Sequence, residues 1–135
     1  MLKLMIGVKG TGKTKTLIEM VNNATSVSQG AVVCIEKGDK LRYDVKYQAR
    51  LINTTEYYID DAQALFGFVA GMLASNHDVT DLFIDSALKI CQNDSAAFDK
   101  FLDEMNVLIE KLGINVVMTS SLAVENATDT VKKYL

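Results

Sequence analysis

The chain has 135 residues and a mass of 14.8 kDa, which is enough for one hydrophobic core but not for two. Hydrophobic residues make up 49% and charged residues 23%, while proline is absent where average usage would give about seven; a disordered, collagen-like or proline-rich chain is excluded. The 14 basic and 17 acidic residues give a net charge of −3, so we expect no broad nucleic-acid surface.

The first half of the chain alternates between strand-like and helical segments. Short apolar or β-branched runs predict buried strands. Between the first two runs, the apolar residues Leu17, Ile18, Val21 and Ala24 recur at helical spacing and predict an amphipathic helix. The expected elements are strands over 2–6, 31–35 and 47–53, a helix from 13 to about 24, a glycine-punctuated turn over 7–12, and loops over 25–30 and 36–46.

The second half continues the same alternation. Asp60 and Asp61 suit the first turn of a helix, because acidic residues face the positive end of the helix dipole. A longer helix begins at Asn93 or Asp94, carries an apolar stripe at i, i+3 and i+4 spacing, and ends at Gly113. The expected elements are helices over 60–75 and 94–112, strands over 79–85 and 114–119, and a short closing helix over 126–135.

Strands that alternate with helices predict an α/β fold, a three-layer α-β-α sandwich around a mostly parallel sheet. No internal repeat or shift in composition divides the chain, so we expect residues 1–135 to form one domain. Cys34 and Cys91 lie in apolar settings without the spacing of metal ligands, and we expect two buried thiols.

The segment Gly7-Val8-Lys9-Gly10-Thr11-Gly12-Lys13-Thr14 matches the pattern G-x-x-x-x-G-K-[ST] in full. Its glycines let the backbone curl so that successive N–H groups point at phosphate oxygens, and the following helix adds its positive end. The lysine reaches the β- and γ-phosphates, and the threonine hydroxyl binds Mg²⁺. The residues expected to contact the nucleotide here are Gly7, Lys9, Gly10, Thr11, Gly12, Lys13, Thr14 and Lys15.

A second anchor for the metal is expected at the end of a buried strand. Leu82-Phe83-Ile84-Asp85 is such a strand end, and Asp85 is therefore predicted to hold Mg²⁺ together with Thr14. Asp81 is the competing acid, but it begins the apolar run instead of ending it.

With these two motifs the chain resembles the P-loop NTPases, with Gly7–Thr14 as the Walker A segment and Asp85 as the Walker B acid. The resemblance spans nearly the whole order of elements and is closest to the RecA-like branch. It implies that the strand after Asp85 lies between the strand that precedes Gly7 and the strand that ends at Asp85. It also implies that a polar residue at the tip of this middle strand, Thr119 or Ser120, senses the γ-phosphate. A serine-rich turn without that role is the alternative.

Catalytic residues are less clearly marked. The resemblance gives Lys13 a role in phosphate chemistry, and it assigns the water-activating carboxylate to Glu36, with Asp39 behind it. A strict alignment instead places Gly38 at the catalytic position, so a plain loop charge is an equal reading of Glu36. Many P-loop enzymes also need an arginine, and only Arg42 and Arg50 are present.

Two functions remain open on this basis. One is a nucleotide-dependent switch or slow ATPase that binds a nucleoside triphosphate, ATP by default, with Mg²⁺. The alternative is an active ATP-hydrolysing enzyme of RecA-like type. A looser likeness to thymidine-kinase-type proteins makes a small-molecule or nucleoside kinase a third, weaker reading, because the acid pair after Asp85 and the zinc cysteines of those proteins are missing.

The predicted helix over 60–75 is apolar almost all round, with Gly67 and Gly71 four residues apart. Such a helix is packed on two sides or covered by another chain, so we expect a protein partner or a homo-oligomer through this helix. The N-terminal apolar run is too short for a signal peptide and no stretch is long enough to cross a bilayer. We therefore expect a cytoplasmic protein without membrane contact.

Overall fold

The computed structural model describes all 135 residues and has an α/β fold. A sheet of five strands forms its centre, and every neighbouring pair is parallel, in the order β1-β5-β4-β2-β3. The expected three-layer sandwich is confirmed, and its sheet is wholly parallel instead of mostly so. The strands are β1 (Leu2–Gly7), β2 (Ala31–Glu36), β3 (Ala49–Asn53), β4 (Val79–Ile84) and β5 (Asn115–Ser121).

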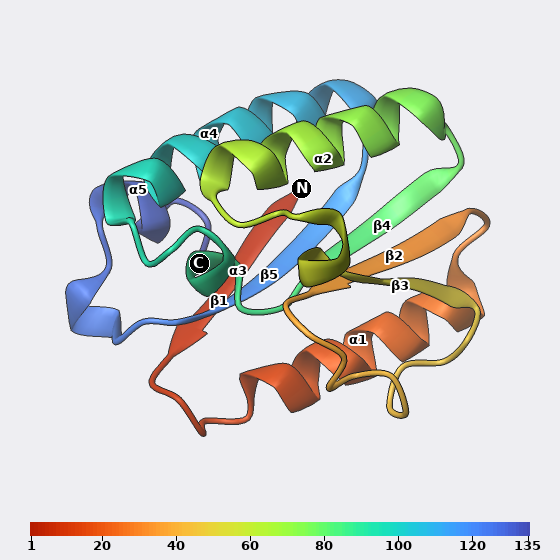
Figure 1. The fold of residues 1–135 in the computed structure, drawn as a ribbon, viewed down its shortest axis with the longest axis horizontal. Coiled ribbons are helices and arrows are strands. Elements are labelled where there is room, and N and C mark those ends of the chain that lie inside the picture. The colour runs from red at the N-terminus through yellow and green to blue at the C-terminus, as the bar shows by residue number, and fades with distance from the viewer.

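Helices cover both faces of the sheet (Figure 1). One face carries α1 (Lys13–Val27), and the opposite face carries the long helices α2 (Ala62–Ser75) and α4 (Ser95–Leu112). The shorter elements are the 3₁₀ turns η1 (Thr54–Tyr57) and η2 (Val124–Asn126) and the single-turn helices α3 (Ala87–Ile90) and α5 (Asp129–Lys132).

The connections explain this division of helices. The chain moves across the sheet in one direction from β1 to β2 and β3, and in the other direction from β3 to β4 and β5. Because parallel strands are joined by right-handed crossovers, the two directions place their connections on opposite faces. The carboxyl ends of all five strands therefore meet at one edge of the sheet, where ligands bind in open α/β folds.

Each face of the sheet buries its own apolar cluster. Strand β2 is buried on both faces, with Val33 and Ile35 in the larger cluster under α2 and α4, and Val32 and Cys34 in the smaller one under α1. Leu41, from the connection between β2 and β3, completes the smaller cluster. This alternation is why β2 reads as a continuous apolar run.

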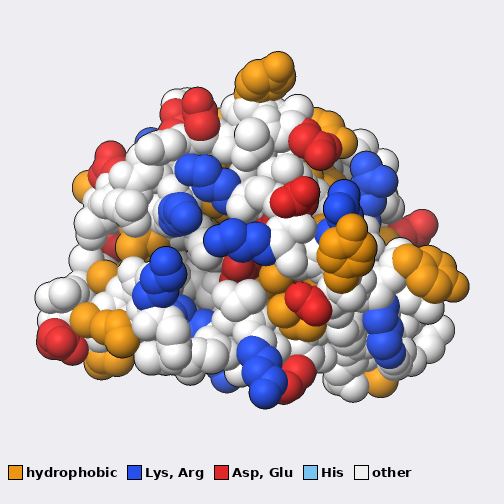
Figure 2. Space-filling model, turned by 60° about the horizontal axis from the view of Figure 1, so that its bottom comes forward, with side chains coloured by type: hydrophobic (Ala, Val, Ile, Leu, Met, Phe, Trp, Pro, Cys, Tyr) orange, Lys and Arg blue, Asp and Glu red, His pale blue; other side chains and the backbone are white.

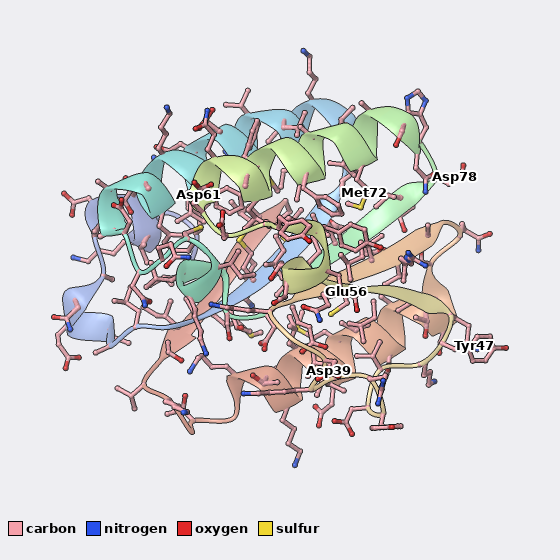
Figure 3. All side chains as sticks on the ribbon, viewed as in Figure 1. Asp39, Tyr47, Glu56, Asp61, Met72 and Asp78 are labelled. Atoms are coloured by element: carbon pink, nitrogen blue, oxygen red, sulfur yellow. The ribbon has the colours of Figure 1, made fainter.

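Capping side chains fix the starts of the two long helices. Asp61, labelled in Figure 3, accepts a hydrogen bond from Ala64 N at 2.7 Å, and Asp94 accepts one from Ala97 N at 3.1 Å. Gly113 ends α4 with a φ of +70°, a value that glycine adopts readily. The predicted apolar stripe of α4 is buried at Phe98, Phe101, Leu102, Met105 and Ile109. Its other two predicted members differ, since Leu108 is half-buried and Leu112, in the last turn, is exposed.

Some predicted boundaries were wrong by a few residues. The first helix extends to Val27 instead of ending near residue 24, and β3 begins at Ala49 instead of 47. The closing helix over 126–135 shortens to the one turn of α5. Tyr134 holds the tail down instead, because its carbonyl accepts from Leu4 N at 2.7 Å and so pairs an edge of β1.

Helix α2 finds most of its cover inside the chain. Leu65, Val69 and Leu73 are buried against the sheet and α4, whereas Gly67 and Gly71 are exposed with open space above them. The exposed strip of α2 consists of Gln63, Gly67, Gly71 and Ala74, so most of the large apolar side chains of this helix are covered within the chain. No helix in the structure combines the length and the hydropathy needed to span a bilayer.

Candidate functional site

The segment Gly7–Thr14 joins the carboxyl end of β1 to the first turn of α1. Gly10 and Gly12 both have a φ of +87°, a backbone conformation that L side chains rarely adopt. None of the backbone N–H groups from Lys9 to Lys15 donates a hydrogen bond to a protein acceptor. These donors, at the positive end of α1, form an anion-attracting loop.

The side chain of Lys13 braces this loop. Its Nζ donates to the carbonyl oxygens of Gly7 and Val8, at 2.9 and 3.0 Å, and lies 3.4 Å from Thr11 Oγ1. The Thr11 hydroxyl donates to Val8 O at 2.8 Å. A Cβ on Gly7 would lie 2.9 Å from Thr11 Oγ1, so the same packing requires glycine at that position. The ammonium group is thus held within the loop.

Side chains from α1, β4 and β5 converge on one carboxylate. Asp85, which directly follows β4, accepts at Oδ1 from Thr14 Oγ1 at 3.1 Å and from Thr119 Oγ1 at 2.7 Å. Thr119 Oγ1 also accepts from Ser86 N at 2.8 Å. The structure therefore joins Thr14 and Asp85, the two residues predicted to hold Mg²⁺, by a direct hydrogen bond.

The two predicted sensor residues lie on opposite faces of β5. Thr119 faces the α1 side and contacts Asp85, as described above. Ser120 is fully buried on the other side, where its Oγ accepts from Leu88 N at 3.1 Å and caps α3. The geometry favours Thr119 over Ser120 for any contact with a ligand near Asp85.

A cavity of about 620 Å³ opens beside the loop and Asp85. Figure 2 shows Lys and Arg side chains gathered around a hollow on this side of the molecule. Asp85 is the only carboxylate among the lining residues, so the wall is strongly basic although the chain carries a net charge of −3. The lining lysines are Lys9, Lys13, Lys15, Lys40 and Lys89.

Glu36 is neither a free base nor a solvated charge. It is 2% exposed, and its two carboxylate oxygens accept from Lys40 N and Leu41 N, each at 3.1 Å. Burial raises the pKa of Glu36 above its ordinary value, the two backbone N–H groups oppose this, and Asp85 and Asp39 add to the rise. Glu36 lies outside the residues that line the cavity, and it clamps the loop that does line it.

Asp39, Arg42 and Arg50 also lie outside the cavity lining. Asp39 is exposed in the connection after β2 (Figure 3). Arg42 is exposed and donates from Nη2 to Tyr43 Oη at 2.9 Å, with its guanidinium 4.9 Å from the centre of that ring. Arg50 is exposed on β3. Neither arginine lines the cavity.

The donor set fits Mg²⁺ held together with a phosphate ligand. No group of three or more His, Cys, Asp or Glu side chains could hold a metal by itself. Thr14 and Asp85 offer one hydroxyl and one carboxylate, and Mg²⁺ usually takes only one or two protein oxygens when phosphates and waters complete its octahedron. The residues present therefore suit a metal that arrives with a nucleotide.

Several lining residues were missed at the sequence level. Lys40 follows β2, and Ser86, Lys89 and Asn93 follow β4, so all four come from connections at the carboxyl edge of the sheet. Their positions directly after predicted strands were the signal that could have found them, because the connections that follow parallel strands meet at the carboxyl edge of the sheet, where ligands bind. Both cysteine thiols are buried as expected, and burial raises the pKa of Cys34 and of Cys91 to about 12.

Neither a protein-family model nor a curated protein matches this sequence.

Proposed function

We propose that this chain binds a nucleoside triphosphate, ATP in the first instance, together with Mg²⁺ through the Gly7–Thr14 loop. The observation that carries the proposal is the meeting of three features at one place: unpaired backbone N–H groups, the ammonium of Lys13, and the contact between Thr14 and Asp85. The position of β5 between β1 and β4 is the strand order that the RecA-like branch of the P-loop NTPases implies.

Within this proposal the protein acts as a nucleotide-dependent switch or a slow ATPase. Both oxygens of Glu36 are held by backbone N–H groups, and the residue after Asp85 is Ser86 instead of an acid. No arginine lines the cavity to offset charge in a transition state. These features favour binding over rapid hydrolysis.

Equilibrium titration with Mg-ATP and Mg-GTP tests the binding step. Lys13→Ala should weaken binding at least tenfold, because charge-assisted hydrogen bonds to phosphate are worth about 1.5–3 kcal/mol each. Lys132→Ala, in α5 and exposed, is the matched control and should bind as the wild type does. Absence of binding to any nucleoside triphosphate, or equal affinity of the Lys13 variant, would refute the proposal.

Single-turnover phosphate release, with protein in excess over ATP, separates the switch from the active enzyme. We expect slow release or none. Fast release that is lost in Glu36→Gln and kept in Asp39→Asn would instead support the RecA-like hydrolysing enzyme, with Glu36 as its base. The two acids differ in burial, so the pair of variants compares a clamped carboxylate with an exposed one.

A protein partner or a second copy of the chain, docked on α2, remains part of the proposal. The exposed strip of α2 contains Gln63, Gly67 and Gly71. Sedimentation velocity with and without Mg-ATP tests this step, and Gly67→Gln should abolish association if the strip is the interface. A chain that stays monomeric at all concentrations, both with and without Mg-ATP, would refute association between copies through this strip.

A further inference from the structure

A second cavity, of about 280 Å³, lies beside the first at the carboxyl edge of the sheet. Its walls come from the residue after β2, from η1 and the residues that follow it, and from the end of α3. It shares no lining residue with the larger cavity. What is inferred about it is therefore independent of nucleotide binding.

Thr54 marks this cavity as unusual. The residue is 1% exposed and lines the cavity, and its Oγ1 is the one buried side-chain oxygen or nitrogen in the chain without a hydrogen-bond partner. Its backbone carbonyl is satisfied, since Thr54 O accepts from Ile59 N at 3.0 Å. Buried hydroxyls almost always have a partner. This unpartnered hydroxyl belongs to a residue that lines a cavity, which is where a ligand would supply the missing hydrogen bond.

The walls around Thr54 are braced. Gln92 Nε2 donates to Asp60 O at 2.5 Å and so ties the end of α3 to the segment after η1. Asn53 Oδ1 accepts from Gly38 N at 2.8 Å and from Thr55 N at 3.0 Å, which ties the connection after β2 to η1. These bonds hold the cavity open between segments that are distant in sequence.

Two opposite charges lie on the rim without partners. Lys37 and Asp60 both line the cavity, and neither takes part in an ion pair. The lining also includes two buried apolar side chains, Ile59 and Ile90. The lining residues thus include one positive group, one negative group, one unsatisfied hydroxyl and two apolar side chains.

We propose that this cavity binds a small zwitterion of the free amino-acid type. Its carboxylate would face Lys37, its ammonium group would face Asp60, and one of its polar atoms would pair with Thr54 Oγ1. The side chain of the ligand would lie on Ile59 and Ile90. The volume is just below the range of about 300–1,000 Å³ that holds drug-sized ligands, which suits a molecule of this size.

Calorimetry and amide chemical-shift mapping test the proposal on the full chain, with L-leucine, L-threonine and L-glutamine as probes. We expect at least one probe to bind at millimolar concentration or tighter and to shift the amides of 54–60 and 90–92. For L-leucine, the analogues 4-methylpentanoate and 3-methylbutylamine each lack one charge and should bind about tenfold more weakly. No binding by any probe, or shifts confined to the Gly7–Thr14 loop, would overturn the proposal.

Thr54→Val separates a ligand role from a structural one. The variant keeps the shape of the side chain and removes the hydroxyl, so it should raise the unfolding temperature and weaken the bound probe about fivefold or more. Thr130→Val, a half-buried control in α5, should leave the affinity unchanged. A Thr54 variant that unfolds at a lower temperature, or that binds the probe with unchanged affinity, would contradict the proposal.

The two rim charges are tested in the same way. Lys37→Gln and Asp60→Asn should each weaken the probe about tenfold, and each should lose less affinity for the analogue that already lacks the matching charge. Lys46→Gln, an exposed lysine outside the cavity, is the control for total charge. Equal losses for both analogues would show that the charges act at long range and not on the ligand.

Discussion

Replacing Glu36 tests how the loop beside the larger cavity is held. In Glu36→Ala, Lys40 N and Leu41 N both lose their acceptor, and Leu41 N lies in the buried part of the loop. A buried donor left without a partner costs about 1–3 kcal/mol, and the partly exposed one costs less. We expect a loss of about 2–4 kcal/mol in the free energy of unfolding.

Glu36→Gln should behave differently, because the side chain keeps its shape and loses its charge. Burial raises the pKa of Glu36 above its ordinary value of 4.5 even though two backbone N–H groups oppose the rise. The folded state therefore binds a proton more tightly than the unfolded state does. The stability that this contributes is present in full below pH 4.5 and is lost as the pH rises through the folded-state pKa.

The measurement is urea unfolding of wild type, Glu36→Gln and Glu36→Ala across pH 4–8, with the exposed Glu19→Gln as control. The stability of wild type relative to Glu36→Gln should fall as the pH rises above 4.5 and then level off. A relative stability that grows with pH would mean that the two backbone hydrogen bonds outweigh desolvation. That result would refute the reasoning about Glu36.

Three further predictions concern stability. Tyr134→Phe removes the 2.6 Å hydrogen bond to Asp103 Oδ1 and should lower the free energy of unfolding by about 1 kcal/mol at pH 7. This hydrogen bond helps to lower the pKa of Asp103, so the loss should shrink when unfolding is measured below pH 3.8. Gly12→Ala has open space for its Cβ but a φ of +87°, so thermal unfolding should show a loss of about 1–2 kcal/mol. Thr119→Val leaves Asp85 without one donor and should cost about 1–3 kcal/mol in chemical unfolding.

Most of the fold could be predicted because its elements carry strong patterns. The apolar residues of α4 recur at helical spacing, and the short β-branched apolar run of β2 is typical of a strand buried on both faces. Once the strand order is known, the right-handedness of the crossovers assigns each connection to one face of the sheet. α3 could not be predicted, because its four residues are too few to show a helical period and its start depends on the Ser120 hydroxyl, which is distant in sequence.

The candidate site was predictable where one segment carries it and unpredictable where the fold assembles it. The Gly7–Thr14 loop and Asp85 could be found by spacing and by position at a strand end. The burial of Glu36 could not, because it depends on the loop folding back so that Lys40 N and Leu41 N reach the carboxylate. The second cavity had no local pattern, since its walls come from three separate connections.

Backbone conformation links the two cavities. Four residues other than glycine have positive φ values, and all four line a cavity: Ser86 and Asn93 the larger one, Tyr58 and Gln92 the smaller one. A connection that only had to turn would take glycine there without strain, as Gly113 does after α4. The chain instead keeps side chains at strained positions, and such strain concentrates at functional sites. The connection from 86 to 93 contributes Ser86, Leu88, Lys89 and Asn93 to the larger cavity and Ile90 and Gln92 to the smaller one, although no residue lines both.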